Sequence, residues 1–301
     1  MNKQAKKDVK IQETVRKAMV AAQDGDLEGL MVYADAIGSV DAAISDSETL
    51  LMRACSSKKT DCAIWLLAAG ANVGLVDREG RTALSRAAME GALDIVEALM
   101  EAGSPDMKDF QGFTALMFAA QQASGQVCQA LAKAHGVSAV NDFGWSALQC
   151  AARFGNVGAA KAIACFAGCD PASPNGDRAM EVAAYMFDLP MLGFLAGAGL
   201  ADRPSRMDGP NPLLRAMRIE LQKPHIEACA ASVADFLSSL YGVEGKWDGK
   251  TAYEYAMKRE RADAAKLLLA KQMALAQKDE IEKSLGEKPA LRGNAKAKGS
   301  L

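Results

Sequence analysis

Hydrophobic positions along the chain recur in blocks of about 32 residues, each with the same internal order. In the block that starts at residue 77, a short polar stretch is followed by two segments with apolar residues at helical spacing. The second segment ends at Gly103, which suits the left-handed end of a helix. Its apolar positions are Leu93, Ile95, Val96, Leu99 and Met100. One block therefore predicts a turn and two antiparallel helices.

The polar openings of the blocks repeat as well. The segment Asp77-Arg-Glu-Gly80-Arg-Thr82-Ala-Leu84 recurs 32 residues later from Asp109 and again from Asn141. Glycines at 80, 112, 144, 176 and 209 are separated by 32, 32, 32 and 33 residues. So regular a period is typical of a solenoid of stacked repeats.

Each opening predicts its own local structure. Asp or Asn followed by Gly favours a turn, and the Thr or Ser two residues after Gly can cap the next helix through its hydroxyl group. Pairs of alanines then allow neighbouring helices to approach closely. These pairs are Ala87-Ala88, Ala119-Ala120, Ala151-Ala152 and Ala183-Ala184.

The pattern resembles the ankyrin-repeat family, whose repeat reads Asp-x-x-Gly-x-Thr-Pro-Leu-His-x-Ala-Ala before a second helix. The block with Thr82, Leu84, Gly91 and Gly103 matches best. The resemblance implies an all-α solenoid of stacked helix-turn-helix units with hairpin-like turns. Two departures are consistent: the family proline is mostly Ala, at 83, 115, 147 and 179, and the family histidine is replaced. The residues in the histidine position are Met52, Ser85, Met117, Gln149, Glu181, Leu214 and Glu254.

The repeats predict the organisation of the chain. We expect a flexible N-terminus at 1–11, a degenerate N-terminal capping repeat at 12–44, and ankyrin repeats one to five at 45–205. A divergent repeat with an insertion follows at 206–244, then a C-terminal capping repeat with an extended helix at 245–285. Residues 286–301 are polar and basic and predict a disordered tail. The helix from residue 262 could also serve as a coiled-coil arm, but its heptads are few and favour a cap.

In the ankyrin family, partner contacts fall on the turns and on the first helix of each repeat. Although only 6% of the residues are aromatic, aromatic side chains gather at those positions in repeats three to five. We therefore expect a partner-binding surface formed by Phe110, Phe113, Phe143, Trp145, Arg153, Phe154 and Tyr185. The alternative is that adjacent turns pack these rings against one another as a scaffold.

Composition narrows the class of function. The 35 basic and 37 acidic residues nearly balance, which argues against nucleic acid as the partner, although the basic tail leaves that alternative open. Without an apolar run of about 20 residues, no membrane association is expected. Seven cysteines, spread through apolar helical patterns, predict reduced and buried thiols. These features favour a soluble cytoplasmic protein that is monomeric alone.

No motif predicts catalysis, a cofactor or a metal site. Cys165 and Cys169 are the nearest approach to a metal pair, but only His135 and His225 could complete it, without zinc-finger spacing. We therefore expect a non-enzymatic interaction module, a scaffold, adaptor or inhibitor, that binds a protein partner through its concave face and finger loops. The alternatives are a substrate-positioning subunit of an enzyme complex and a hydrolase with an unrecognised site.

Overall fold

The computed structural model describes residues 3–43, 47–122, 124–166, 174–199, 224–241, 243, 246–247, 250–258 and 261–286. The chain divides into two compact units, Met1–Met207 and Asp208–Leu301. The first contains the repeats with the clearest sequence pattern. We call these parts unit 1 and unit 2.

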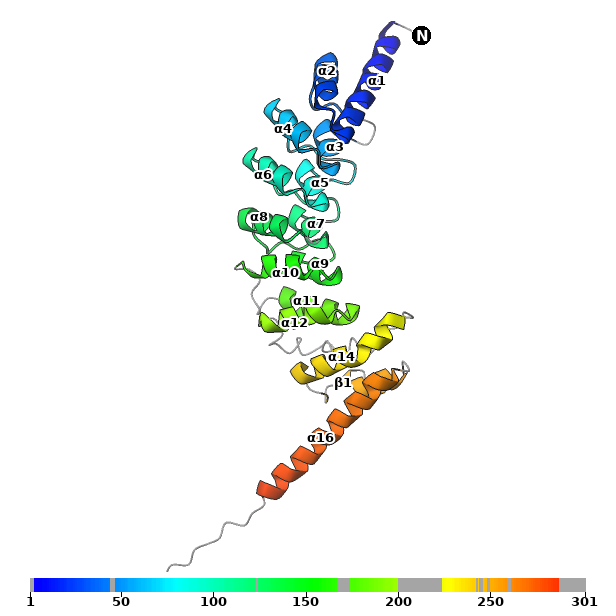
Figure 1. The fold of residues 1–301 in the computed structure, drawn as a ribbon, viewed down its shortest axis with the longest axis vertical. Helices are drawn as coiled ribbons and strands as arrows, with labels where there is room; N and C mark the ends of the chain where they lie inside the picture. The colour runs from blue at the N-terminus through cyan, green and yellow to red at the C-terminus, as the bar shows by residue number, and fades with distance from the viewer. Residues whose placement is uncertain are drawn as a thin grey trace, which may run out of the picture. The chain divides into compact units, whose positions relative to one another are not determined.

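Unit 1 is a stack of helix pairs in two layers (Figure 1). The first-helix layer consists of α1 (Lys3–Asp24), α3 (Leu50–Ser56), α5 (Ala83–Glu90), α7 (Ala115–Gln121), α9 (Ala147–Arg153) and α11 (Pro174–Met186). The second-helix layer consists of α2 (Leu27–Ile37), α4 (Thr60–Ala68), α6 (Leu93–Glu101), α8 (Gly125–His135), α10 (Val157–Ala164) and α12 (Leu189–Gly197). Each helix packs on its partner and on the same layer of the adjacent repeats. The predicted all-α solenoid is confirmed.

The helix starts follow the predicted capping chemistry. The hydroxyl oxygens of Thr82, Thr114 and Ser146 accept hydrogen bonds from the backbone N–H groups three residues later, at 3.2, 3.4 and 3.3 Å. Thr49 caps α3 in the same way. These bonds satisfy backbone donors that would otherwise lack partners at a helix N-terminus.

The core lies between the two layers. All four predicted alanine pairs are completely buried, and so are Ile95, Val96 and Leu99 on α6. Small side chains in the first-helix layer let the stacked helices approach closely, while larger aliphatic ones in the second layer supply apolar area. Both roles agree with the sequence pattern.

The residues in the family's histidine position take several roles. The Gln149 side chain accepts a hydrogen bond from the Ser146 backbone N–H at 3.0 Å, completing a capping box with the Ser146 hydroxyl group. Glu254 accepts one from the Thr251 backbone N–H at 2.7 Å. Met52 and Met117 are buried and apolar. Capping and core packing therefore replace the histidine in different repeats.

Two features differ from the sequence expectations. A helix is present from Lys3, where the sequence predicts a flexible segment to residue 11. Gly176 lies inside α11, whereas its spacing predicts a turn like those at Gly80, Gly112 and Gly144. At those three glycines φ is between 74° and 81°, which favours glycine over other residues. The period alone therefore does not identify a turn at Gly176.

Unit 2 contains α14 (Pro224–Tyr241), the antiparallel strand pair β1 (Lys246–Trp247) and β2 (Lys250–Thr251), α15 (Ala252–Lys258) and α16 (Ala262–Gly286). Lys271 connects α16 to α14, because its Nζ lies 2.8 Å from the Asp235 carboxylate and 2.7 Å from the Ser238 hydroxyl group. Residues 206–223 of the expected divergent repeat and residues 287–301 of the expected tail lie outside the described residues.

Candidate functional site

The turns between repeats form fingers that share one geometry. We define the fingers of repeats two, three and four as residues 77–81, 109–113 and 141–145. The first side chain of each finger, Asp77, Asp109 or Asn141, accepts hydrogen bonds from the backbone N–H groups two and four residues later. The donor-acceptor distances lie between 2.8 and 3.1 Å. Each finger is therefore closed by its own opening residue.

Consecutive fingers are also joined to one another. The backbone N–H of Phe110 donates to the carbonyl oxygen of Glu79 at 3.1 Å, and that of Asp142 donates to Gln111 at 3.1 Å. A Cβ atom at Gly80 would lie 2.9 Å from the Phe110 nitrogen, and one at Gly112 would lie 2.7 Å from the Asp142 nitrogen. Glycine at these positions is required both by its φ angle and by the closeness of the next finger.

The seven predicted partner-binding residues lie on the fingers and the first-helix layer. Phe110 is 71% exposed and Phe143 64%, while Phe154 and Tyr185 are 53% and 42% exposed. Arg153 is exposed, and Phe113 and Trp145 are half-buried. Exposed aromatic side chains of this size are the features that protein interfaces select.

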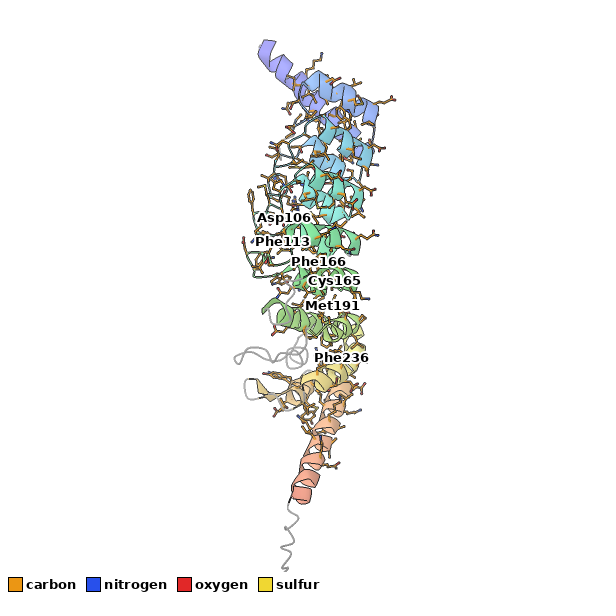
Figure 2. All side chains as sticks on the ribbon, turned by 90° about the vertical axis from the view of Figure 1, so that its left-hand side faces the viewer. Asp106, Phe113, Cys165, Phe166, Met191 and Phe236 are labelled. Atoms are coloured by element: carbon orange, nitrogen blue, oxygen red, sulfur yellow. The ribbon has the colours of Figure 1, made fainter. Side chains whose placement is uncertain are left out.

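Phe113 is the centre of a small aromatic cluster at repeat three. Its ring stacks on Phe118 of α7 with 5.4 Å between centroids and meets Phe143 at 6.5 Å with a tilt of 58°. Figure 2 labels Phe113, and it also labels Asp106, whose carboxylate accepts a hydrogen bond from the Ala115 backbone N–H at 3.3 Å. In this cluster the fingers of repeats three and four pack on each other through Phe113 and Phe143, while the Phe143 ring stays exposed.

Phe118 is not among the partner-binding residues predicted from the sequence, although the 32-residue period marks its position. It lies 32 residues after Arg86, so the repeat period places both side chains on the same part of the first-helix layer. In repeat two this place is ionic: Asp77 accepts bonds from the Arg81 and Arg86 guanidinium groups at 3.0 and 2.5 Å. In repeat three, Phe113 and Phe118 occupy the corresponding positions and stack.

The Asp77 carboxyl group has a lowered pKa despite being buried. Burial raises its pKa, but hydrogen bonds from the Arg81 backbone and from the Arg86 and Arg81 side chains, with the charge of Arg86, outweigh that effect. Asp77 therefore supports the finger and orients two arginines as a structural anion.

In repeat four, Trp145 occupies the position of Phe113, but it contacts Arg153, three residues beyond the position of Phe118. The Arg153 guanidinium carbon lies 5.3 Å from the centroid of the Trp145 ring, within the range of a cation–π interaction. Both residues were predicted as part of the surface, but their contact was not. This contact holds a positive charge over the Trp145 ring of repeat four.

The cysteines are only partly as expected. Cys55, Cys62, Cys128 and Cys150 are buried free thiols, whereas Cys165 is exposed at the end of α10 (Figure 2), so the expectation of buried thiols is wrong there. Burial raises the pKa of Cys55, Cys128 and Cys150 to about 12. The side chains of Cys169 and Cys229 lie outside the described residues. Within the described ranges, no three His, Cys, Asp or Glu side chains gather as metal ligands.

A stack of helix pairs with hydrogen-bonded fingers defines a solenoid repeat protein. A family model of ankyrin repeats in three copies matches residues 18–109 and 103–175, more than half of the chain. The protein belongs to the ankyrin-repeat family, whose repeats are protein–protein interaction modules. No curated protein matches the chain. Among the residues that can be described, no helix is long and apolar enough to cross a membrane.

Proposed function

We propose that the protein is a scaffold, adaptor or inhibitor that holds a protein partner against the fingers and first-helix layer of repeats three to five. The observation that carries this proposal is the exposure of Phe110 and Phe143 on the fingers, and of Phe154 and Tyr185 at the ends of α9 and α11. Aromatic side chains bury a large area at low rotamer cost, so they commonly dominate binding energy. The buried free thiols suit the reducing cytoplasm, which we propose as its location.

The local packing supports binding rather than scaffolding for three of these rings. Phe113 is half-buried between Phe118 and Phe143 and contributes to the fold. Phe110, Phe143 and Phe154 each expose more than half of their surface, so packing inside the stack explains only part of their presence. Contact with a partner would remove the remaining apolar surface from water.

The test compares two multiple variants in cells that express the protein. The aromatic variant carries Phe110→Ala, Phe143→Ala and Phe154→Ala. The control variant carries Val32→Ala and Ile64→Ala, exposed aliphatic residues of the second-helix layer. Affinity purification followed by mass spectrometry should recover a stoichiometric partner with the wild type and the control, and lose it with the aromatic variant.

Circular dichroism and thermal melting separate binding from folding. Because the three rings are mostly exposed, the aromatic variant should retain its helical content and melt close to the wild type. A partner that binds the aromatic variant as well as the wild type would place the binding surface elsewhere. Loss of folding in the aromatic variant would support the scaffolding interpretation instead.

A further inference from the structure

Arg153 differs from Arg53, Arg81 and Arg86 of the first-helix layer and fingers in the group that its charge meets. Arg53 pairs with Glu48 at 2.6 Å, and Arg81 and Arg86 both pair with Asp77. Within the described parts of the chain, Arg153 has a ring as its partner and no carboxylate within ion-pair distance. Its exposed guanidinium group is held over Trp145.

Among the described contacts, the guanidinium N–H groups of Arg153 donate no hydrogen bond, so they are available to a ligand. The N–H donors of arginine lie in the plane of the group in a fixed fork. Two parallel N–H groups match the two oxygens of a carboxylate, and such bidentate pairs are stronger than neutral hydrogen bonds. The Trp145 ring also reduces the mobility of the side chain before any partner arrives.

The side chains at the positions around Arg153 indicate which other groups a ligand needs. At the finger and first-helix positions of repeats three and four, the neighbours are mainly aromatic or amide side chains. These are Phe110, Gln111, Phe113, Gln121, Gln122, Phe143, Trp145 and Phe154. Asp142 is exposed there as well, but among the described contacts it forms no ion pair with Arg153. Lys108 is a second cation next to these fingers, and its Nζ is held 2.7 Å from the Val140 carbonyl oxygen. A cation beside apolar rings, as at Arg153, complements a negative charge that is flanked by apolar groups.

From this charge and apolar complementarity we propose that the partner presents a peptide segment with an Asp or Glu beside apolar side chains. The acidic side chain pairs with Arg153, and the apolar side chains lie on the rings of Phe110, Phe113, Phe143 and Phe154. This inference rests on the proposed function, because it specifies the chemistry of the partner for the same surface. A monovalent carboxylate suits one guanidinium group better than a phosphate, whose larger charge favours several cations.

The experiment starts from a phage-displayed library of random linear peptides. Peptides are selected on the wild-type protein after depletion on the aromatic variant, and enriched sequences are synthesised. Their dissociation constants are then measured for the wild type, Arg153→Gln, Arg153→Lys and Arg16→Gln. Arg16 is an exposed arginine on α1 and serves as the matched control.

Enriched peptides should contain an acidic residue beside apolar ones. Arg153→Gln should weaken their binding by about ten- to a hundredfold, because a charge-assisted hydrogen-bonded pair is lost. Arg153→Lys should have an intermediate effect, since lysine keeps the charge but not the planar pair of donors. Arg16→Gln should leave the dissociation constant unchanged.

A double-mutant cycle identifies the contact itself. Replacing the acidic residue of the peptide with its amide should weaken binding to the wild type as much as Arg153→Gln does, and should add little in the Arg153→Gln protein. Additive losses would overturn the pairing. Melting temperatures of all variants should stay near the wild-type value, because the Arg153 side chain is exposed.

The remaining outcomes separate this inference from the proposed function. Peptides that need the aromatic rings but lack acidic residues, and that ignore Arg153→Gln, would overturn the inference and leave the proposed function intact. If no selected peptide binds the wild type more tightly than the aromatic variant, the inference is also overturned. The proposed function stays intact in that case, because the partner purification tests it separately. Binding of a mixed-sequence single-stranded oligonucleotide that is lost in the aromatic variant would assign the surface to nucleic acid and overturn it too.

Discussion

Asp77 carries two separate tasks in repeat two, and a substitution can separate them. Its Oδ1 atom closes the finger, as Asn141 does in repeat four, while its Oδ2 atom holds Arg81 and Arg86. Asp77→Asn keeps a side-chain acceptor for the turn and removes the charge that pairs with both arginines. We expect it to lower the free energy of unfolding by about 1 to 3 kcal/mol.

Asp109→Asn is the matched control for this substitution. Asp109 closes its finger in the same way, but Phe113 and Phe118 stand where repeat two has its arginines. Its free energy of unfolding in urea should change by less than about 0.5 kcal/mol. Equal losses for the two variants would show that the turn, and not the ion pairs, accounts for the effect of Asp77.

The Asp77→Asn variant also tests how the stabilisation by Asp77 depends on pH. Because the folded pKa of Asp77 lies below its ordinary value of 3.8, the stabilisation is fully present above that value. It is lost as pH falls through the folded pKa, where the native carboxylate becomes protonated. The difference in free energy of unfolding between the wild type and Asp77→Asn should therefore shrink when urea titrations are carried to pH values below 3.8. A constant difference would contradict the assigned role of the charge.

Thiol reactivity should distinguish the cysteines residue by residue. At pH 8 a thiol with a pKa of about 12 is ionised in about one molecule in ten thousand, and Cys55, Cys128 and Cys150 are also buried. Cys165 is exposed and should be alkylated by iodoacetamide in the native protein, while those three react only after unfolding. Peptide mass spectrometry after a timed reaction checks this. Equal labelling of Cys165 and Cys128 would contradict the packing of α8 and α10.

Single-residue roles were predictable where the cause is local in sequence. Thr82 as a cap and Gly80 as a turn residue depend on groups within a few residues, so the repeat pattern was sufficient. Cys165 was assigned to the interior because its neighbours are apolar, but it follows the last turn of α10 and lies outside the packed face. The bonds of Asp77 to Arg86 cross nine residues and depend on how the finger meets α5, which the pattern does not contain.

At the scale of elements, the joining of consecutive fingers can be tested at Gly112. Alanine there would adopt an unfavourable φ near 79° and place its Cβ 2.7 Å from the Asp142 nitrogen. Gly103→Ala is the control, because φ is 77° but nothing lies within 4 Å of the added atom. We expect a loss of about 1 kcal/mol for Gly103→Ala and about 2 to 4 kcal/mol for Gly112→Ala in chemical unfolding. Equal losses would mean that the fingers can separate freely.

Elements were predicted well where pattern and packing agree. From α5 to α10 the glycine turn, the hydroxyl cap and the alanine pair occur together, and each repeat folds accordingly. At Gly176 the spacing is kept, but the cap position carries Arg178 and a proline precedes the glycine at Pro174. The structure extends α11 through this segment, since proline is well tolerated in the first turn of a helix. The sequence pattern names both Arg153 and Trp145, but it does not predict their contact. That contact depends on how a finger packs against α9.

At the scale of the whole molecule, stability should spread from repeat to repeat. In unit 1, α5 packs on α3, α6 and α7, so repeat two is supported mainly by its immediate neighbours. In such a stack, the loss of one repeat's stability is shared with adjacent repeats and fades with distance. Unit 2 has its own packing among α14, α15 and α16.

Hydrogen exchange of the Asp77→Asn variant tests this view of the chain. Amides in α5 and α6 should exchange about 5 to 150 times faster than in the wild type, because opening of repeat two becomes easier by about 1 to 3 kcal/mol. The acceleration should be smaller in α3 and α7, smaller again in α9, and absent from α15 and the first turns of α16. If α15 and α16 accelerate as much as α5, the two units unfold as one cooperative block, and a change in repeat two acts on the entire molecule.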